Sequence, residues 1–111
     1  MTSPLRLGLA QINATVGDIE GNCRLIEAAY GRAAAAACDL VILPELALTG
    51  YPPEDLLLHA GFIDAARAAL EELARGVTRG GLLVGAPWRE EGRLLNAAVV
   101  LADGRIAGVY A

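Results

Sequence analysis

Glu45 is the residue of this sequence best placed to do chemistry. It follows a short apolar run, Leu40–Leu43, and Pro44 stands between the run and the glutamate. In open α/β sheets, ligands gather at the carboxyl edge of the strands, and a proline restricts the backbone at such an exit. A carboxylate held there and partly removed from water can act as a general base. From position alone, a solvated or helix-capping loop glutamate remains the alternative.

The other residues of catalytic type have simpler interpretations. His59 is the only histidine, and no cysteine or acidic cluster accompanies it at metal-ligand spacing. Cys23 falls inside a helical pattern and Cys38 at its end, where a free thiol behaves as a small buried apolar residue. Asn96 interrupts an apolar stretch, so we expect a buried amide bonded to neighbouring backbone. The sequence therefore predicts no metal site.

The first elements around Glu45 follow from the spacing of apolar residues. Leu5–Ile12 alternates between apolar leucines and smaller or polar residues, which predicts a strand. Asp18 is a plausible N-cap for a helix, and the run at Leu40–Leu43 predicts a strand covered on both faces. One face of the predicted helix carries apolar or small residues at steps of three and four: Ile19, Cys23, Ile26, Tyr30, Ala33 and Ala37.

A loop, a helix and three more strands are predicted after Glu45. Pro52 and Pro53 exclude a continuous helix through residues 44–58. Asp103-Gly104 is a two-residue hairpin signal. The second helix carries Phe62, Ala66, Leu70, Leu73 and Val77 at helical spacing, and the later strands are predicted at Leu82–Ala86, Leu94–Ala102 and Arg105–Tyr110.

The predicted order, β-α-β-loop-α-β-β-β, defines an α/β fold class with a mixed sheet. Two helical crossovers imply that the first three strands are parallel, and the hairpins add antiparallel strands. Both helices should lie on one face of this sheet. The other face also carries leucine and valine, and no element of the sequence is left to cover it. We therefore expect the chain to be incomplete or to assemble.

Composition excludes several classes of protein. The chain has 111 residues, 55% of them hydrophobic and 20% charged, which fits one folded domain and excludes disorder. Its net charge is −4, and its 9 basic residues, all arginine, are scattered singly, so neither nucleic acid nor an anionic membrane is an expected partner. No apolar run approaches the roughly 20 residues of a membrane span, and no signal peptide is visible. Two cysteines without an export signal indicate reduced thiols in the cytoplasm.

Several motifs match one family in register. The segment Asp39–Leu46 resembles the first catalytic motif of the nitrilase, or carbon–nitrogen hydrolase, superfamily. Within that superfamily, Leu48–Leu57 is most similar to the glutamine-dependent NAD synthetases. The resemblance extends from Leu5 to Tyr110. It also includes Leu7–Asn13, Val16–Asp18, Gly21-Asn22, Leu83–Trp88 and Leu95–Val100.

The resemblance implies part of an α-β-β-α sandwich with a Glu–Lys–Cys triad, in which Glu45 is the base. The sequence contains no lysine, and Gly108–Ala111 stops one residue short of the family's Val-Tyr-x-Lys pattern. Neither Cys23 nor Cys38 matches the family's nucleophile. We therefore expect residues 1–111 to be a truncated N-terminal portion of the amidase domain, inactive by itself.

Two further residues gain an interpretation from the family. Tyr51 could line the glutamine pocket, as its family counterpart does, or it could anchor the proline-rich loop. Ala37 closes the first helix where family members often carry glycine, in a position suited to a left-handed cap. An alanine in that conformation would cost on the order of 1 kcal/mol.

The implied activity is hydrolysis of glutamine, whose ammonia converts deamido-NAD to NAD at a separate synthetase domain. ATP and magnesium would act in that domain, none of whose ATP-site motifs occurs in these residues, so no cofactor is expected in this chain. The family also implies a homo-oligomer. Two alternatives remain: a stand-alone carbon–nitrogen hydrolase of another amide or nitrile, and a non-catalytic fragment or docking module.

Overall fold

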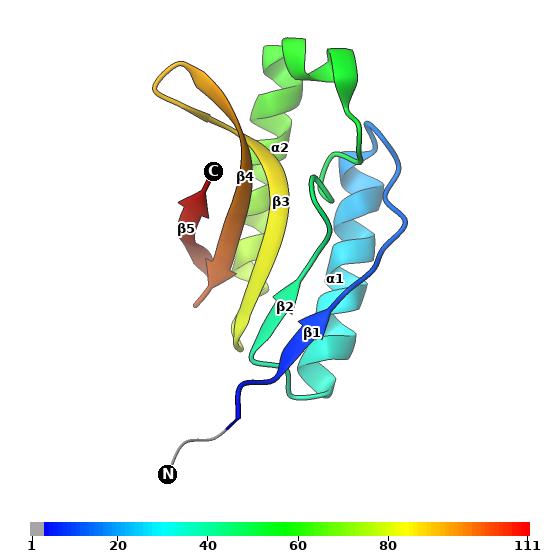
Figure 1. Cartoon of the computed structure of the whole chain (residues 1–111), viewed down its shortest axis with the longest axis vertical. Helices are drawn as coiled ribbons and strands as arrows, with labels where there is room; N and C mark the ends of the chain where they lie inside the picture. Colours follow the sequence, from blue (N-terminus) through cyan, green and yellow to red (C-terminus); the bar gives the residue numbers. More distant parts are fainter. Residues whose placement is uncertain (1–3) are drawn as a thin grey trace.

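One mixed sheet of five strands organises the chain, in the spatial order β1-β2-β3-β4-β5 (Figure 1). The computed structural model describes residues 4–111. The first three strands are parallel and the last two join by antiparallel pairing. This confirms the predicted α/β class and element order. The strands are β1 (Leu7–Leu9), β2 (Leu40–Ile42), β3 (Gly81–Glu90), β4 (Arg93–Ala102) and β5 (Arg105–Tyr110).

The first helix, α1 (Ile19–Ala35), begins and ends as the sequence predicts. The Asp18 side chain accepts a hydrogen bond of 2.9 Å from the Gly21 N–H and so caps the first turn. At the other end, the N–H groups of Ala37 and Cys38 each donate a 3.0 Å bond back into the last turn. This closing pattern requires a left-handed residue, and Ala37 has φ +60°.

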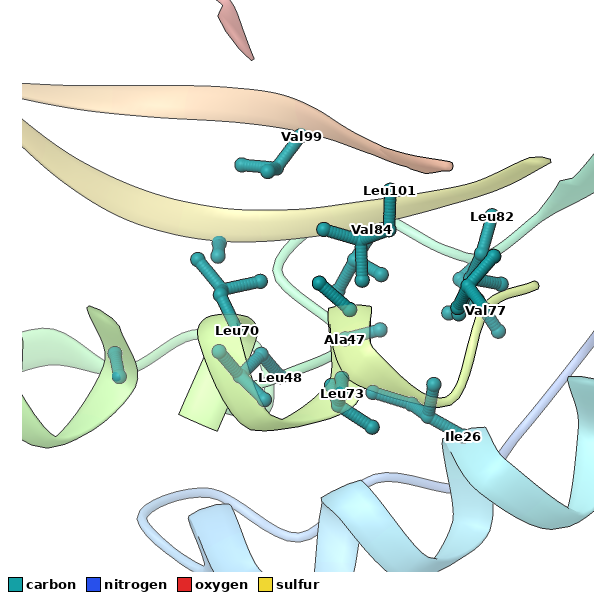
Figure 2. Packing of buried hydrophobic residues seen from close by; sticks show 14 of the residues in the cluster. Ile26, Ala47, Leu48, Leu70, Leu73, Val77, Leu82, Val84, Val99 and Leu101 are labelled. Carbon is teal, nitrogen blue, oxygen red and sulfur yellow. The ribbon is translucent and has the colours of Figure 1, made fainter. Parts of the chain in front are cut away.

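Both helices lie on the same face of the sheet (Figure 1). The loop after β2 leads through a short 3₁₀ helix, η1 (Glu54–Leu58), into α2 (Ala60–Arg75). Figure 2 shows Leu70 of α2 directed at the sheet and Leu73 of α2 directed toward Ile26 of α1. The buried core between helices and strands includes Ile26, Val41, Leu48, Leu70, Leu73, Val77, Leu82, Val84, Val99 and Leu101.

The strand β1 begins at Leu7 rather than Leu5 and ends at Leu9 rather than Ile12. Pro44 supplies the reason for the early end. The last bond between β1 and its neighbour runs from the Ala10 N–H to the Ile42 carbonyl, at 2.9 Å. The next bond of the ladder would need a backbone N–H at residue 44 of the neighbouring chain segment. That residue is Pro44, which has no N–H to donate. The parallel ladder ends there, and the segments following both strands become loops.

The second half of the sheet is built from two tight hairpins. At the predicted turn, Asp103 and Gly104 have φ +55° and +75°, the left-handed pair that suits the strand twist. Glu91 and Gly92 repeat this geometry between β3 and β4, with φ +51° and +76°. The continuous register of that hairpin carries β3 to Glu90, past the predicted end at Ala86.

The face of the sheet opposite the helices carries apolar side chains that the described residues leave partly in solvent. We call it the open face. Pairing partners share a face, which assigns to it Leu7, Leu9, Leu40, Ile42, Leu83, Ala98, Val100 and Tyr110. Leu9 is 80% exposed and Tyr110 is 63% exposed. Within residues 4–111, no helix has both the length and the apolar character that crossing a membrane would need.

Candidate active site

Glu45 lies in the loop that leaves β2, where its backbone is held although its side chain is exposed. Leu46 has φ +49°, an uncommon conformation for a leucine. The loop then rejoins β3 through the Leu48 N–H, which donates a 3.2 Å bond to the Gly85 carbonyl. The sequence predicts partial desolvation of this carboxylate. The structure shows it in solvent, because the described residues leave the open face uncovered.

Gly85 allows the Glu45 loop to lie directly on β3. A Cβ atom at this position would overlap the Leu46 backbone nitrogen, and it would stand 2.9 Å from the Pro44 carbonyl oxygen and 3.1 Å from the Glu45 carbonyl carbon. Backbone atoms cannot yield as a flexible side chain can. A side chain larger than hydrogen would therefore displace the loop that carries the candidate base.

Two buried polar side chains hold the far end of the same loop. The Asn22 amide donates to the carbonyls of Thr15 and Leu48, at 2.9 and 3.0 Å, and its oxygen accepts from the Thr15 N–H at 2.8 Å. Thr49 is fully buried, and its hydroxyl lies 3.4 Å from the Leu46 carbonyl. Buried amides with several bonds give rigid connections. The helix α1 thus fixes the segment after Glu45.

Asn96 is the side chain that meets the Glu45 carboxylate. Its Nδ2 donates to Oε2 of Glu45 at 2.6 Å, across 51 positions of sequence. The expectation of a buried amide bonded to neighbouring backbone is wrong. Asn96 is exposed and pairs with Pro87 across the hairpin, on the open face. Side chains alternate along a strand, so the apolar Ala97 next to Asn96 was a sequence signal that Asn96 faces away from the core. Nothing in the sequence indicated that Glu45 would be its partner.

Glu45 and Tyr51, the two predicted site residues, line one small hollow of about 170 Å³. The Tyr51 side chain is 65% exposed. Ile12, Asn13 and Ala14 also line this hollow. The structure therefore places both residues at one opening, beside the loop that follows β1.

A larger hollow of about 530 Å³ lies elsewhere, between α1 and α2. Glu27, Tyr30 and Leu73 are among the residues that line it, and neither Glu45 nor Tyr51 does. The candidate site is therefore not at the larger of these two hollows, and the volume of a hollow does not identify it.

The two thiols lie away from the Glu45 hollow. Cys23 is on α1 and Cys38 follows it, and both are half-buried and free. Burial raises the pKa of the Cys23 thiol from 9.0 to about 11, and the nearby Glu27 adds to the shift. A thiol protonated so firmly is a poor nucleophile. Within residues 4–111, no three His, Cys, Asp or Glu side chains could hold a metal ion.

The chain belongs to the carbon-nitrogen hydrolase family, whose pattern matches residues 6–111. This confirms the family indicated by the motifs. The chain is 44% identical to the glutamine-dependent NAD(+) synthetase of Rhodobacter capsulatus and 41% identical to that of Thermotoga maritima. Each match covers 96% of this chain but 19% of the relative. The chain thus spans about a fifth of the length of these relatives.

Solved structures show the same relationship. A glutamine-dependent NAD(+) synthetase from Cytophaga hutchinsonii superposes with a TM-score of 0.91 at 33% identity, over 96% of this chain and 18% of that one. An amidase from Nesterenkonia sp. gives 0.78 at 28% identity, over 96% of this chain and 41% of the amidase. The mixed sheet with two helices is therefore the arrangement found in nitrilase-superfamily structures.

Proposed function

We propose that this chain is part of a glutaminase that supplies ammonia for the ATP-dependent conversion of deamido-NAD to NAD. Residues 1–111 form the N-terminal portion of the amidase domain. Glu45 is the general base of a Glu–Lys–Cys triad whose lysine and cysteine lie outside this sequence. The supporting observation is the Glu45 carboxylate beside a hollow shared with Tyr51, in a chain similar to glutamine-dependent NAD(+) synthetases.

The chemistry assigned to Glu45 is proton transfer. The carboxylate accepts the thiol proton as the sulfur attacks the glutamine carboxamide carbon, and the lysine stabilises the oxyanion. The C–N bond then breaks, and the proton taken from the thiol leaves with the nitrogen as ammonia. Water hydrolyses the thioester to glutamate and restores the thiol. A base held on a fixed loop is suited to both halves of this reaction.

Tyr51 is proposed to contact glutamine. It lines the Glu45 hollow and is largely exposed, which leaves its ring available to a ligand. Its other interpretation, as an anchor for the proline-rich loop, predicts a different consequence of substitution, described in the Discussion.

The remaining partners belong to the complete protein. We assign ATP, magnesium and deamido-NAD to a synthetase domain outside these residues, so no step of the proposed amide hydrolysis passes through them. A homo-oligomer and a cytoplasmic location complete the proposal. Neither nucleic acid nor a membrane is included, in keeping with the scattered arginines and the net charge of −4.

The substitution Glu45→Gln in the complete gene product tests the assignment. Glutamine-dependent NAD formation should be lost, whereas NAD formation from added ammonia should continue, because only thiol activation is removed. Glu90→Gln, at an exposed position near the β3–β4 turn, is the matched control and should retain both activities. Continued glutamine turnover in Glu45→Gln would rule out Glu45 as the base.

One alternative is a stand-alone hydrolase of another amide or nitrile. The favouring observation is the likeness to the Nesterenkonia amidase, of which this chain covers 41%. Assays of the complete gene product with glutamine and with short aliphatic amides separate the two. Turnover of aliphatic amides without glutamine-dependent NAD formation would support the alternative.

A second alternative is a non-catalytic short chain that serves as a docking module. The intact mass of the gene product in its own cells decides this case. A mass several times 11.5 kDa would leave room for the lysine, the cysteine and the synthetase domain. A mass near 11.5 kDa would mean that the triad never forms within this polypeptide.

A further inference from the structure

The hydrogen bond between Asn96 and Glu45 joins a rigid element to a loop. Asn96 lies on β4, which pairs with β3 along its whole length. The neighbouring Ala97 is 3% exposed and anchors the strand in the core. Glu45 lies beyond the end of β2 and has an exposed side chain. The strand therefore supplies a fixed donor for a side chain that would otherwise sample several rotamers.

The bond engages one carboxylate oxygen and leaves the other available. Nδ2 of Asn96 lies 2.6 Å from Oε2 of Glu45, a short, charge-assisted bond. Among the hydrogen bonds of residues 4–111, none involves Oε1. An amide donor orients the carboxylate without bringing a positive charge beside it. A carboxylate held by Oε2 can accept a proton at Oε1.

We propose that Asn96 is a positioning residue for the catalytic base, an inference that rests on the proposed role of Glu45. Asn96 holds Oε2 so that Oε1 faces the reacting thiol in one orientation. It acts through Glu45 and need not contact the substrate. Its loss therefore lowers the rate of glutamine hydrolysis more than it weakens glutamine binding. A misplaced catalytic group of this kind costs up to about a hundredfold in rate.

Three substitutions at Asn96 distinguish the effect of its hydrogen-bond donor from the effect of its side-chain shape. Asn96→Leu keeps the approximate size and removes the donor. Asn96→Asp keeps the shape but places a second carboxylate next to that of Glu45. Because the two groups repel each other, this variant should be the most impaired of the three. Asn96→Gln retains an amide donor on a longer arm and should recover part of the activity lost in Asn96→Leu. Leu94→Ala, on the same strand and face, is the control and should keep the parent rate.

The measurements are kcat and KM for glutamine hydrolysis, NAD formation from added ammonia, and the thermal midpoint, all on the complete gene product. Asn96→Leu should lose roughly tenfold to a hundredfold in kcat, with KM within about threefold. Its ammonia-dependent activity should equal that of the parent. From the highest kcat to the lowest, the order should be parent, Asn96→Gln, Asn96→Leu and Asn96→Asp.

Glu45→Gln measured in parallel distinguishes the two proposals. If Glu45→Gln is inactive on glutamine but Asn96→Leu keeps the parent kcat, the positioning role is overturned and the base stands. A raised KM with unchanged kcat would make Asn96 a substrate contact instead. Equal losses in all three Asn96 variants, accompanied by a lowered thermal midpoint, would show a structural role only. If Glu45→Gln keeps its glutaminase activity, the proposed function itself fails.

Discussion

Gly85 on β3 lies directly beneath the backbone of Leu46, so that a Cβ atom on the glycine would overlap the leucine nitrogen. Leu46 in turn has φ +49°. These two features hold the loop against the sheet and set the point from which the Glu45 side chain departs. A glycine in a strand usually weakens it. Here the glycine makes room for the close approach of a second backbone.

The substitution Gly85→Ala should therefore disturb both stability and activity. The added methyl group forces the Glu45 loop away from β3, and we expect a loss of roughly 1–3 kcal/mol in the free energy of unfolding. Glutamine hydrolysis should fall with it. Gly31→Ala is the control, since a Cβ atom there meets nothing within 4 Å and alanine favours the helix. Denaturant unfolding that gives the same midpoint for Gly85→Ala and the parent would contradict this account.

Ala37 offers the opposite case, a position where glycine should stabilise the protein. Its φ of +60° is left-handed, which costs an alanine about 1 kcal/mol relative to glycine. Ala37→Gly should raise the free energy of unfolding by about that amount. The neighbouring Ala36 has φ −86°, so Ala36→Gly should give no gain. Equal effects of the two substitutions in denaturant unfolding would refute the explanation.

Cys23 should make stability depend on pH in the alkaline range. Burial raises the pKa of its thiol from 9.0 to about 11, so the folded protein retains the proton that the unfolded chain releases. The stability that Cys23 contributes is complete below pH 9 and declines as the pH rises toward 11. Cys23→Ala should show a smaller decline over this range. Unfolding midpoints measured below pH 9 and near pH 11 test this, and parallel declines would disprove it.

Tyr51→Ala distinguishes the two interpretations of that residue. If Tyr51 contacts glutamine, KM should rise by roughly three- to tenfold, the size of one modest contact, with little change in the thermal midpoint. Leu58→Ala, which removes a side chain that is 83% exposed, should change neither quantity. A lowered thermal midpoint with an unchanged KM would instead identify Tyr51 as an anchor of the proline-rich loop.

Local signals in the sequence predicted most of the fold. Asp18 caps α1, and Asp103-Gly104 turns β4 into β5, because each outcome depends on hydrogen bonds and dihedral angles a few residues apart. The parallel order of the first strands followed from the helical crossovers. The predicted length of β1 was wrong. The end of this strand depends on how far the neighbouring β2 continues before Pro44, and the alternation of residues within β1 carries no information about β2.

The sequence by itself determined the family, the element order and the place of Glu45 after an apolar strand. Only the tertiary structure decided what surrounds that glutamate. Asn96 is 51 positions away and meets it through the register of β3 with β4, and Gly85 admits the loop through a backbone contact. The exposure of Glu45 was likewise decided in three dimensions, by a sheet face that no described element covers. The periodicity of a sequence assigns a side chain to one face of a sheet. Which side chain it meets on that face depends on the register of the paired strands and on the path of the loops between them.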